Sequence, residues 1–155
     1  MRWHDAPADP HEDARRLADE LLPAAKLLIE RFGEILPLGA LIGPKGELEQ
    51  VPCPEGIYET NVLAQAELLR QAFARRADEG ELRASALIYD PALSNSDEVR
   101  TAGSLTIEIE HFTGYNVTMI VPYRKSSGEL TFLAPVVGEG AYRIFVRRDE
   151  ATGRR

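Results

Sequence analysis

Three acidic or imidazole side chains stand close together in the sequence, at Glu108, Glu110 and His111. Carboxylates and imidazoles bind metals or transfer protons in many active sites. On a β-strand, however, alternate residues point to opposite faces, so the two glutamates share one face and His111 lies on the other. The sequence therefore predicts no metal site and no catalytic residue here, and we interpret the glutamates as solvated.

Cys53 is the only cysteine in the chain, and Pro52 and Pro54 flank it. A nucleophilic cysteine reacts as its thiolate, which a nearby histidine or a helix N-terminus usually stabilises. The residues around Cys53 supply no such partner, and a single cysteine also excludes an internal disulfide. We therefore interpret Cys53 as a passive loop residue. An enzyme that uses Cys53 or the paired carboxylates is the least favoured of three functional hypotheses.

The segment Gly43-Pro44-Lys45-Gly46 combines glycines with a lysine, but its spacing is not that of a phosphate-binding P-loop. It follows the near-continuous apolar run Ile35–Ile42, which is typical of a central strand buried on both faces. We therefore expect a hairpin turn here, with Glu47–Val51 returning antiparallel. Because no cofactor-binding motif is recognised elsewhere, we expect no cofactor.

Two helices are predicted from apolar residues spaced three and four positions apart. The first begins at Asp9-Pro10 and ends at Gly33, and Pro23 should kink its middle. The second begins at Thr60 and ends at Gly80. Their apolar stripes are Leu17, Leu21, Ala24, Leu28 and Phe32 in the first helix, and Val62, Ala66, Leu69, Phe73 and Ala77 in the second.

Apolar and polar residues alternate between residues 105 and 136, which predicts a three-stranded antiparallel meander after a strand at Leu82–Tyr89. We expect Ile107 opposite Val121 and Val121 opposite Phe132, because this register keeps apolar residues opposite apolar residues. Ala141–Val146 is a candidate for an additional edge strand. The fold class is therefore α+β, a two-layer sandwich in which an antiparallel sheet of about six strands carries two helices on one face, in the order α-β-β-α-β-β-β-β.

With both helices on one face, the other face of the meander is exposed, and the predicted register places Ile120 there between Glu108 and Leu133. An apolar centre with an acidic rim suits a protein partner with a basic rim. A loop or the N-terminal segment covering this face is the alternative, and it stays open. The predicted partner-binding residues are Glu108, Glu110, Phe112, Thr118, Ile120 and Leu133.

Composition limits the classes of function. The chain has 155 residues, 44% of them hydrophobic, and a net charge of −7, so an acidic surface argues against nucleic acid. No apolar run approaches the about 20 residues that span a bilayer, and the polar start Met1–Pro10 is unlike a signal peptide. We expect one cytoplasmic domain over residues 1–155, with flexible ends at 1–9 and 148–155, that binds neither nucleic acid nor a membrane.

Three segments resemble small uncharacterised bacterial α+β proteins: Phe32–Ala40, Gly114–Val117 and Val121–Arg124. The predicted order of elements is similar to that of roadblock/longin-type domains, although this chain has at least one extra strand. The resemblance implies a protein-interaction and dimerisation module, with no known activity.

The leading hypothesis is a non-catalytic, acidic protein-binding module, such as an adaptor, chaperone or immunity-type protein, that associates with itself and with a basic protein partner. The alternative is a small-ligand sensor whose pocket lies between a helix and the sheet, near Tyr58, Tyr89 and His111.

Overall fold

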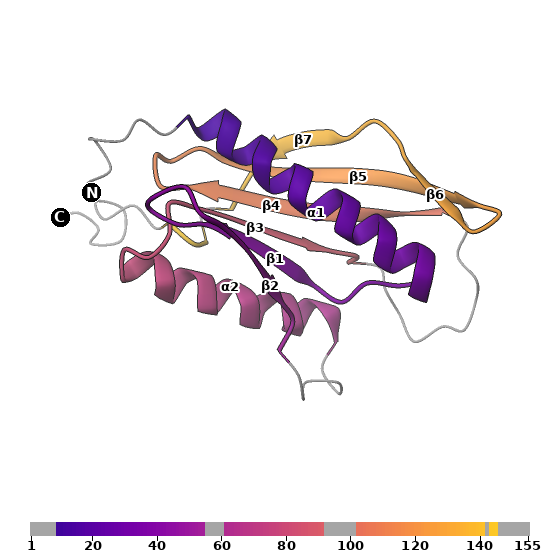
Figure 1. Ribbon diagram of the computed structural model, residues 1–155, viewed down its shortest axis with the longest axis horizontal. Coiled ribbons are helices and arrows are strands. Elements are labelled where there is room, and N and C mark those ends of the chain that lie inside the picture. The colour runs from indigo at the N-terminus through magenta and orange to yellow at the C-terminus, as the bar shows by residue number, and fades with distance from the viewer. Residues whose placement is uncertain (1–8, 55–60, 92–101, 142, 146–155) are drawn as a thin grey trace.

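The computed structural model contains two helices and a seven-stranded antiparallel sheet (Figure 1). It describes residues 9–54, 61–91, 102–141 and 143–145. The strands lie in the order β2-β1-β3-β4-β5-β6, and β7 also pairs with β5. The α+β class, the antiparallel sheet and the order of the elements are therefore confirmed. The predicted flexible ends lie outside the described residues, apart from Asp9.

Helix α1 spans Pro10–Phe32 and has the bounds that its capping residues predict. The Asp9 carboxylate accepts the main-chain N–H of His11 at 2.9 Å, and Gly33 ends the helix with a φ of 84°. Pro23 lies inside the helix. The prediction that Phe32 belongs to the buried stripe is wrong, because Phe32 is exposed where the helix ends. Two other predicted members, Ala24 and Leu28, are only partly buried. The fully buried apolar residues of this face are Leu17, Leu21, Ala25 and Ile29.

Strands β1 (Leu38–Ile42) and β3 (Ala84–Tyr89) are adjacent in the middle of the sheet and are buried at every position. Strand β2 (Leu48–Pro52) pairs with the other side of β1 through the predicted hairpin turn. Strands buried on both faces require a covering layer on both sides of the sheet.

The two helices supply these layers, one on each face. Ala40 and Ile88 pack in the core under α1, whereas their neighbours Leu41 and Leu87 pack under α2, which spans Val62–Asp78. In Figure 1, α1 crosses in front of the sheet and α2 lies behind the β1–β2 hairpin. The prediction of both helices on one face is therefore wrong.

Helix α2 begins at Asn61, whose side chain accepts the main-chain N–H of Ala64 at 2.8 Å. Thr60, the predicted cap, lies outside the described residues. Phe73 of α2 packs directly over Gly39 of β1, where a Cβ atom would stand 2.2 Å from the ring. Gly39 therefore allows α2 to approach the sheet closely.

Strands β4 (Ala102–His111) and β5 (Asn116–Ser126) form the longest hairpin, with Ile107 opposite Met119. The predicted register, Ile107 opposite Val121, is wrong by two residues. The reason is a tight turn, in which the Gly114 N–H donates to the His111 carbonyl at 3.0 Å. A shift of two keeps each side chain on its predicted face.

Strands β6 (Glu129–Phe132) and β7 (Val136–Glu139) both pair with β5, and a β-bulge separates them. The Leu133 N–H donates to the Pro122 carbonyl and Val136 lies opposite Ile120, so two residues, 134 and 135, face the single Val121. The bulge reverses the alternation after Phe132, so Val136 shares a face with Leu133.

Two further predictions for this region are wrong. Phe132 lies opposite Tyr123 and not Val121, again a shift of two residues. The extra strand is β7, and the described residues among 141–146 form no strand. Neither helix in the described part of the chain is long and apolar enough to cross a membrane.

Candidate binding surface

Glu108 lies beneath α2, where it forms a bidentate ion pair with the guanidinium of Arg70. Arg70 Nε and Nη2 donate to the two carboxylate oxygens of Glu108 at 2.7 and 2.8 Å. Arg70 also donates to Glu67, which in turn accepts from Arg143. The interpretation of Glu108 as a solvated rim residue is wrong, because this network joins it to the helix.

Tyr89 belongs to the same network. Its hydroxyl donates to Glu108 Oε2 at 2.8 Å and accepts from Arg70 Nη2 at 3.2 Å. Burial, together with the Glu108 carboxylate, raises the pKa of Tyr89 to about 12, so the phenol stays neutral. The arrangement holds α2 on the sheet.

Glu110 is also covered, in this case by the C-terminal segment. Its carboxylate accepts three main-chain N–H groups, from Arg143, Ile144 and Phe145, at 2.9 to 3.3 Å. The side chain is buried. Glu110 therefore ties residues 143–145 to β4 and is not part of a solvated acidic rim. Its partners are 33 to 35 residues away in sequence, so no local pattern indicated them.

His111 lies on the α1 face, in a buried polar cluster with Asp13 and Arg83. His111 Nε2 lies 2.9 Å from Asp13 Oδ2, and Arg83 donates to both oxygens of Asp13 at 2.9 and 3.0 Å. On its other side, His111 Nδ1 lies 2.8 Å from the Thr113 hydroxyl. An Asp–His pair can activate a nucleophile, and the hydroxyl beside this pair belongs to Thr113, an exposed residue, whereas Asp13 and His111 are themselves buried.

The charges in this cluster are set by burial and hydrogen bonding. Burial lowers the pKa of His111, against the opposing effect of Asp13, so the imidazole is neutral at neutral pH. Burial alone would raise the pKa of Asp13, but hydrogen bonds from Arg83 and His111 lower it. Sequence reasoning missed Asp13, although an acidic residue one turn before Leu17 on the buried stripe was a usable signal.

The predicted ligand pocket does not form from the residues assigned to it. Tyr89 faces α2 and His111 faces α1, so they lie on opposite sides of the sheet. Tyr58 lies outside the described residues. This prediction of a shared site for Tyr89 and His111 is therefore wrong.

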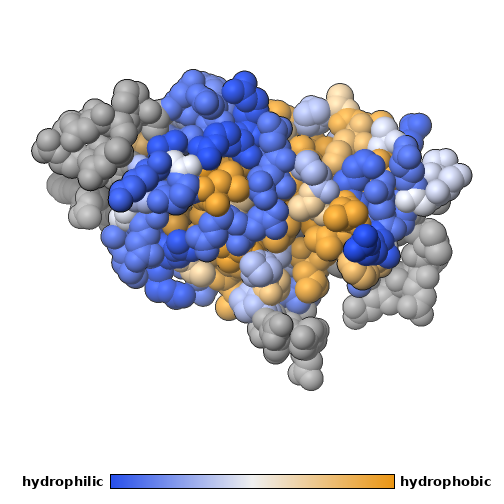
Figure 2. All heavy atoms as spheres, in the orientation of Figure 1, coloured by the Kyte–Doolittle hydropathy of each residue, from blue (hydrophilic) through white to orange (hydrophobic). Residues whose placement is uncertain are grey.

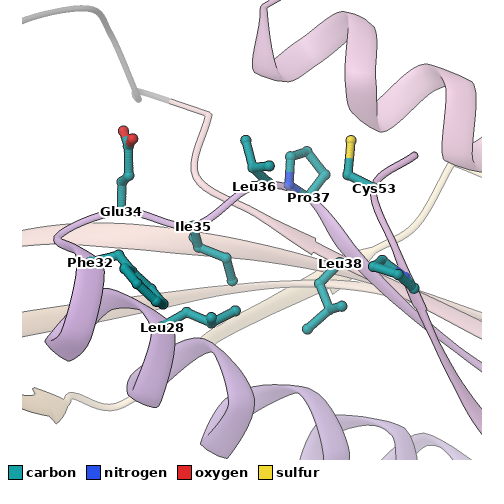
Figure 3. Close-up of a pocket in the computed structure, with 9 residues that line it drawn as sticks. Leu28, Phe32, Glu34, Ile35, Leu36, Pro37, Leu38 and Cys53 are labelled. Atoms are coloured by element: carbon teal, nitrogen blue, oxygen red, sulfur yellow. The ribbon is translucent and has the colours of Figure 1, made fainter. Parts of the chain in front are cut away.

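A pocket of about 340 Å³ does lie elsewhere, between the end of α1, the following loop and the end of β2 (Figure 3). Hydrophobic surface gathers in this region on the face shown in Figure 2. Cys53 lies at the pocket, and burial raises the pKa of its thiol, which disfavours the reactive thiolate. The Glu34 carboxylate points away from the apolar side chains in Figure 3. The lining residues are Leu28, Phe32, Glu34, Ile35, Leu36, Pro37, Leu38, Pro52 and Cys53.

An exposed apolar surface lies on the α2 face of the sheet, beyond the strands that α2 covers. Ile120 lies opposite Val136, and Pro122 lies opposite Leu133, so the four side chains form a square on adjacent strands. Ile120, Leu133 and Val136 are 37, 38 and 66% exposed. We call Ile120, Pro122, Leu133 and Val136 the sheet patch.

The sheet patch contains two of the six predicted partner-binding residues, Ile120 and Leu133, and a third, Thr118, adjoins it on β5. Phe112 lies at the far end of β4, where its ring packs 5.0 Å from His111. Val136 was missed because the sequence carries no alternation signal for the bulge. The structure thus brings together the apolar centre of the predicted surface. The two glutamates of the predicted acidic rim are instead bound within the fold.

Across the described residues, no group of three or more histidine, cysteine, aspartate or glutamate side chains is placed to hold a metal ion. No protein-family model, curated protein or solved structure matches the chain. The resemblance to roadblock/longin-type domains therefore stays a prediction from the order of the elements.

Proposed function

We propose that the chain is a non-catalytic protein-binding module and that the sheet patch is its binding surface. The observation that carries the proposal is the contiguity of three exposed apolar side chains, Ile120, Leu133 and Val136, on adjacent strands. Single exposed apolar residues are common, but a contiguous group on one face is typical of an interface.

The net charge of the molecule favours a basic protein as the partner. The net charge of −7 attracts a basic protein and raises its rate of association. This preference is a property of the whole surface, since Glu108 and Glu110 are already engaged within the fold. Adaptor, chaperone and immunity roles are all compatible with such a module.

The test is the double variant Ile120→Asp/Leu133→Asp. Because both side chains are exposed, we expect the circular dichroism spectrum and the melting curve to stay close to those of the native chain. Self-association in sedimentation, or capture of a partner from the native host, should weaken at least tenfold. Leu27→Asp is the matched control, because Leu27 is an exposed leucine on α1, away from the patch. Unchanged association in the double variant would rule out the sheet patch as the interface.

A small-ligand sensor is the second candidate, and the pocket at the end of α1 favours it. Its volume of about 340 Å³ is within the range of ligand sites, and its lining is almost entirely apolar. We expect an apolar ligand here, because the lining offers few polar groups to fix a charged one. Leu36→Trp should fill the pocket and abolish thermal stabilisation by such a ligand while the sheet patch variants leave it unchanged.

A further inference from the structure

Strand β7 exposes apolar side chains on both faces of the sheet. Val136 lies on the α2 face and is 66% exposed, whereas Val137 lies on the α1 face and is 56% exposed. A partner that docks flat on one face can contact only one of these valines. A partner strand beside β7 contacts both, because side chains of neighbouring strands pack against each other on each face.

Among the described residues, no strand pairs with the outer side of the β7 main chain. The Gly140 N–H donates to the Asn116 carbonyl at 3.1 Å, next to the pair Val117–Glu139. In an antiparallel ladder, hydrogen-bonded pairs alternate, so Gly138 and Val136 also point their main-chain groups toward β5. The N–H and C=O groups of Val137 and Glu139 therefore point outward, and no described strand pairs with them.

We propose that a second copy of the chain adds its own β7 antiparallel to this edge, with Val137 opposite the partner's Val137. The two valines then exchange both of their main-chain hydrogen bonds. Each Glu139 N–H donates to the carbonyl of the partner's Pro135. Because proline has no main-chain N–H, this pairing leaves no donor of Pro135 without an acceptor. This inference rests on the proposed protein-binding function and names its partner and geometry.

The chemistry of β7 disfavours the two symmetric registers whose axis lies beyond Val137. A two-fold axis at Glu139 would place two carboxylates directly opposite each other, which is unfavourable. An axis at Gly138 would place Val137 opposite the partner's Glu139, so that an apolar side chain meets a charged one. An axis at Val137 pairs the two valines and separates the two Glu139 residues by four positions, or about 14 Å, which exceeds the Debye length of about 8 Å at physiological salt.

The proposed dimer also joins the two sheet patches. Antiparallel addition across an edge places the two-fold axis perpendicular to the sheet, so the same face of both copies points to the same side. Val136 then lies opposite the partner's Gly138, and Ile120 and Leu133 flank the junction. One apolar surface of double width results.

The first experiment replaces the outward N–H of Val137. Val137→Pro removes that group without touching the bonds to β5, and edge strands tolerate proline on their solvent side. We expect the dissociation constant in sedimentation equilibrium to rise at least about tenfold, because both central hydrogen bonds are lost. Val137→Thr keeps the N–H and the β-branched shape, and it should dimerise like the native chain.

A second variant covers the case in which Val137→Pro does not fold. Val137→Lys places two like charges opposite each other at the axis and should also raise the dissociation constant at least about tenfold. A native chain that sediments as a monomer up to millimolar concentration, or a folded Val137→Lys variant that dimerises normally, would overturn the proposal.

The register is tested by cross-linking in a Cys53→Ser background. Residues of a hydrogen-bonded pair have Cα atoms about 5.5 Å apart, within the range for a disulfide. Under mild oxidation, Val137→Cys should form covalent dimers and Glu139→Cys should not, whereas the opposite result overturns the register. If Val137→Cys forms covalent dimers but Ile120→Asp/Leu133→Asp still captures the partner normally, the proposed patch is refuted and the dimer is not. A monomeric native chain whose partner capture depends on the patch refutes the dimer alone.

Discussion

Asp13 and His111 come from positions 98 residues apart, and together they make folding sensitive to acid. Burial lowers the pKa of His111 below its usual 6.5 in the folded chain. The unfolded chain therefore binds more protons than the folded one once the pH falls through 6.5, and the free energy of unfolding falls with it. The lowered pKa of Asp13 places its contribution to acid unfolding below about 3.8, so the two effects are separable.

We expect urea midpoints to fall between pH 7.5 and 5.0 in the native chain. In His111→Asn the midpoint at pH 7.5 should be lower, because hydrogen bonds are lost, but the fall between the two pH values should be smaller. An equal fall in both chains would show that another group controls this range. His11→Asn is the control, since His11 is exposed at the start of α1.

At the level of elements, capping residues were more informative than apolar patterns. Both ends of α1 could be predicted from Asp9 and Gly33, because each residue satisfies main-chain groups by a local contact. The faces that the helices cover could not be predicted, because β1 and β3 are apolar at every position and so give no preference. Leu133 and Val136 share a face only because of a bulge that the alternation of the sequence does not record.

The same contrast holds for the candidate site. The exposure of Ile120 was expected because a residue's face survives a register shift of two. The partial burial of Glu108 and the burial of Glu110 could not be predicted, because their partners, Arg70 and residues 143–145, come close only in the folded chain.

The contact of Phe73 with Gly39 gives a second prediction at this level. Gly39→Ala places a Cβ atom against the Phe73 ring, so the ring or α2 must move, and we expect a loss of about 1–3 kcal/mol in the free energy of unfolding. The double variant Gly39→Ala/Phe73→Leu should lose less free energy of unfolding than the two single variants lose together, because the two sites are in contact. Gly138→Ala is the control, because a Cβ atom there meets open space. Strictly additive losses in chemical unfolding would contradict this packing.

For the whole molecule, the net charge of −7 makes salt a means to separate the two kinds of partner. Two copies of an acidic chain repel each other at long range, and added salt screens that repulsion. Self-association through β7 should therefore strengthen between 20 and 300 mM sodium chloride. Association with a basic partner should weaken over the same range, because the same ions screen an attraction.

The measurement is the dissociation constant of each complex by sedimentation equilibrium and by calorimetry, at both salt concentrations. We expect the two constants to move in opposite directions, by about threefold or more, because charges outside the contact act over a Debye length of about 20 Å at the lower salt and about 6 Å at the higher. Self-association that weakens with salt would mean that opposite charges meet in the dimer. Such a result does not fit β7 pairing, since Glu139 is the only charged residue of that strand and the proposed register keeps its two copies apart.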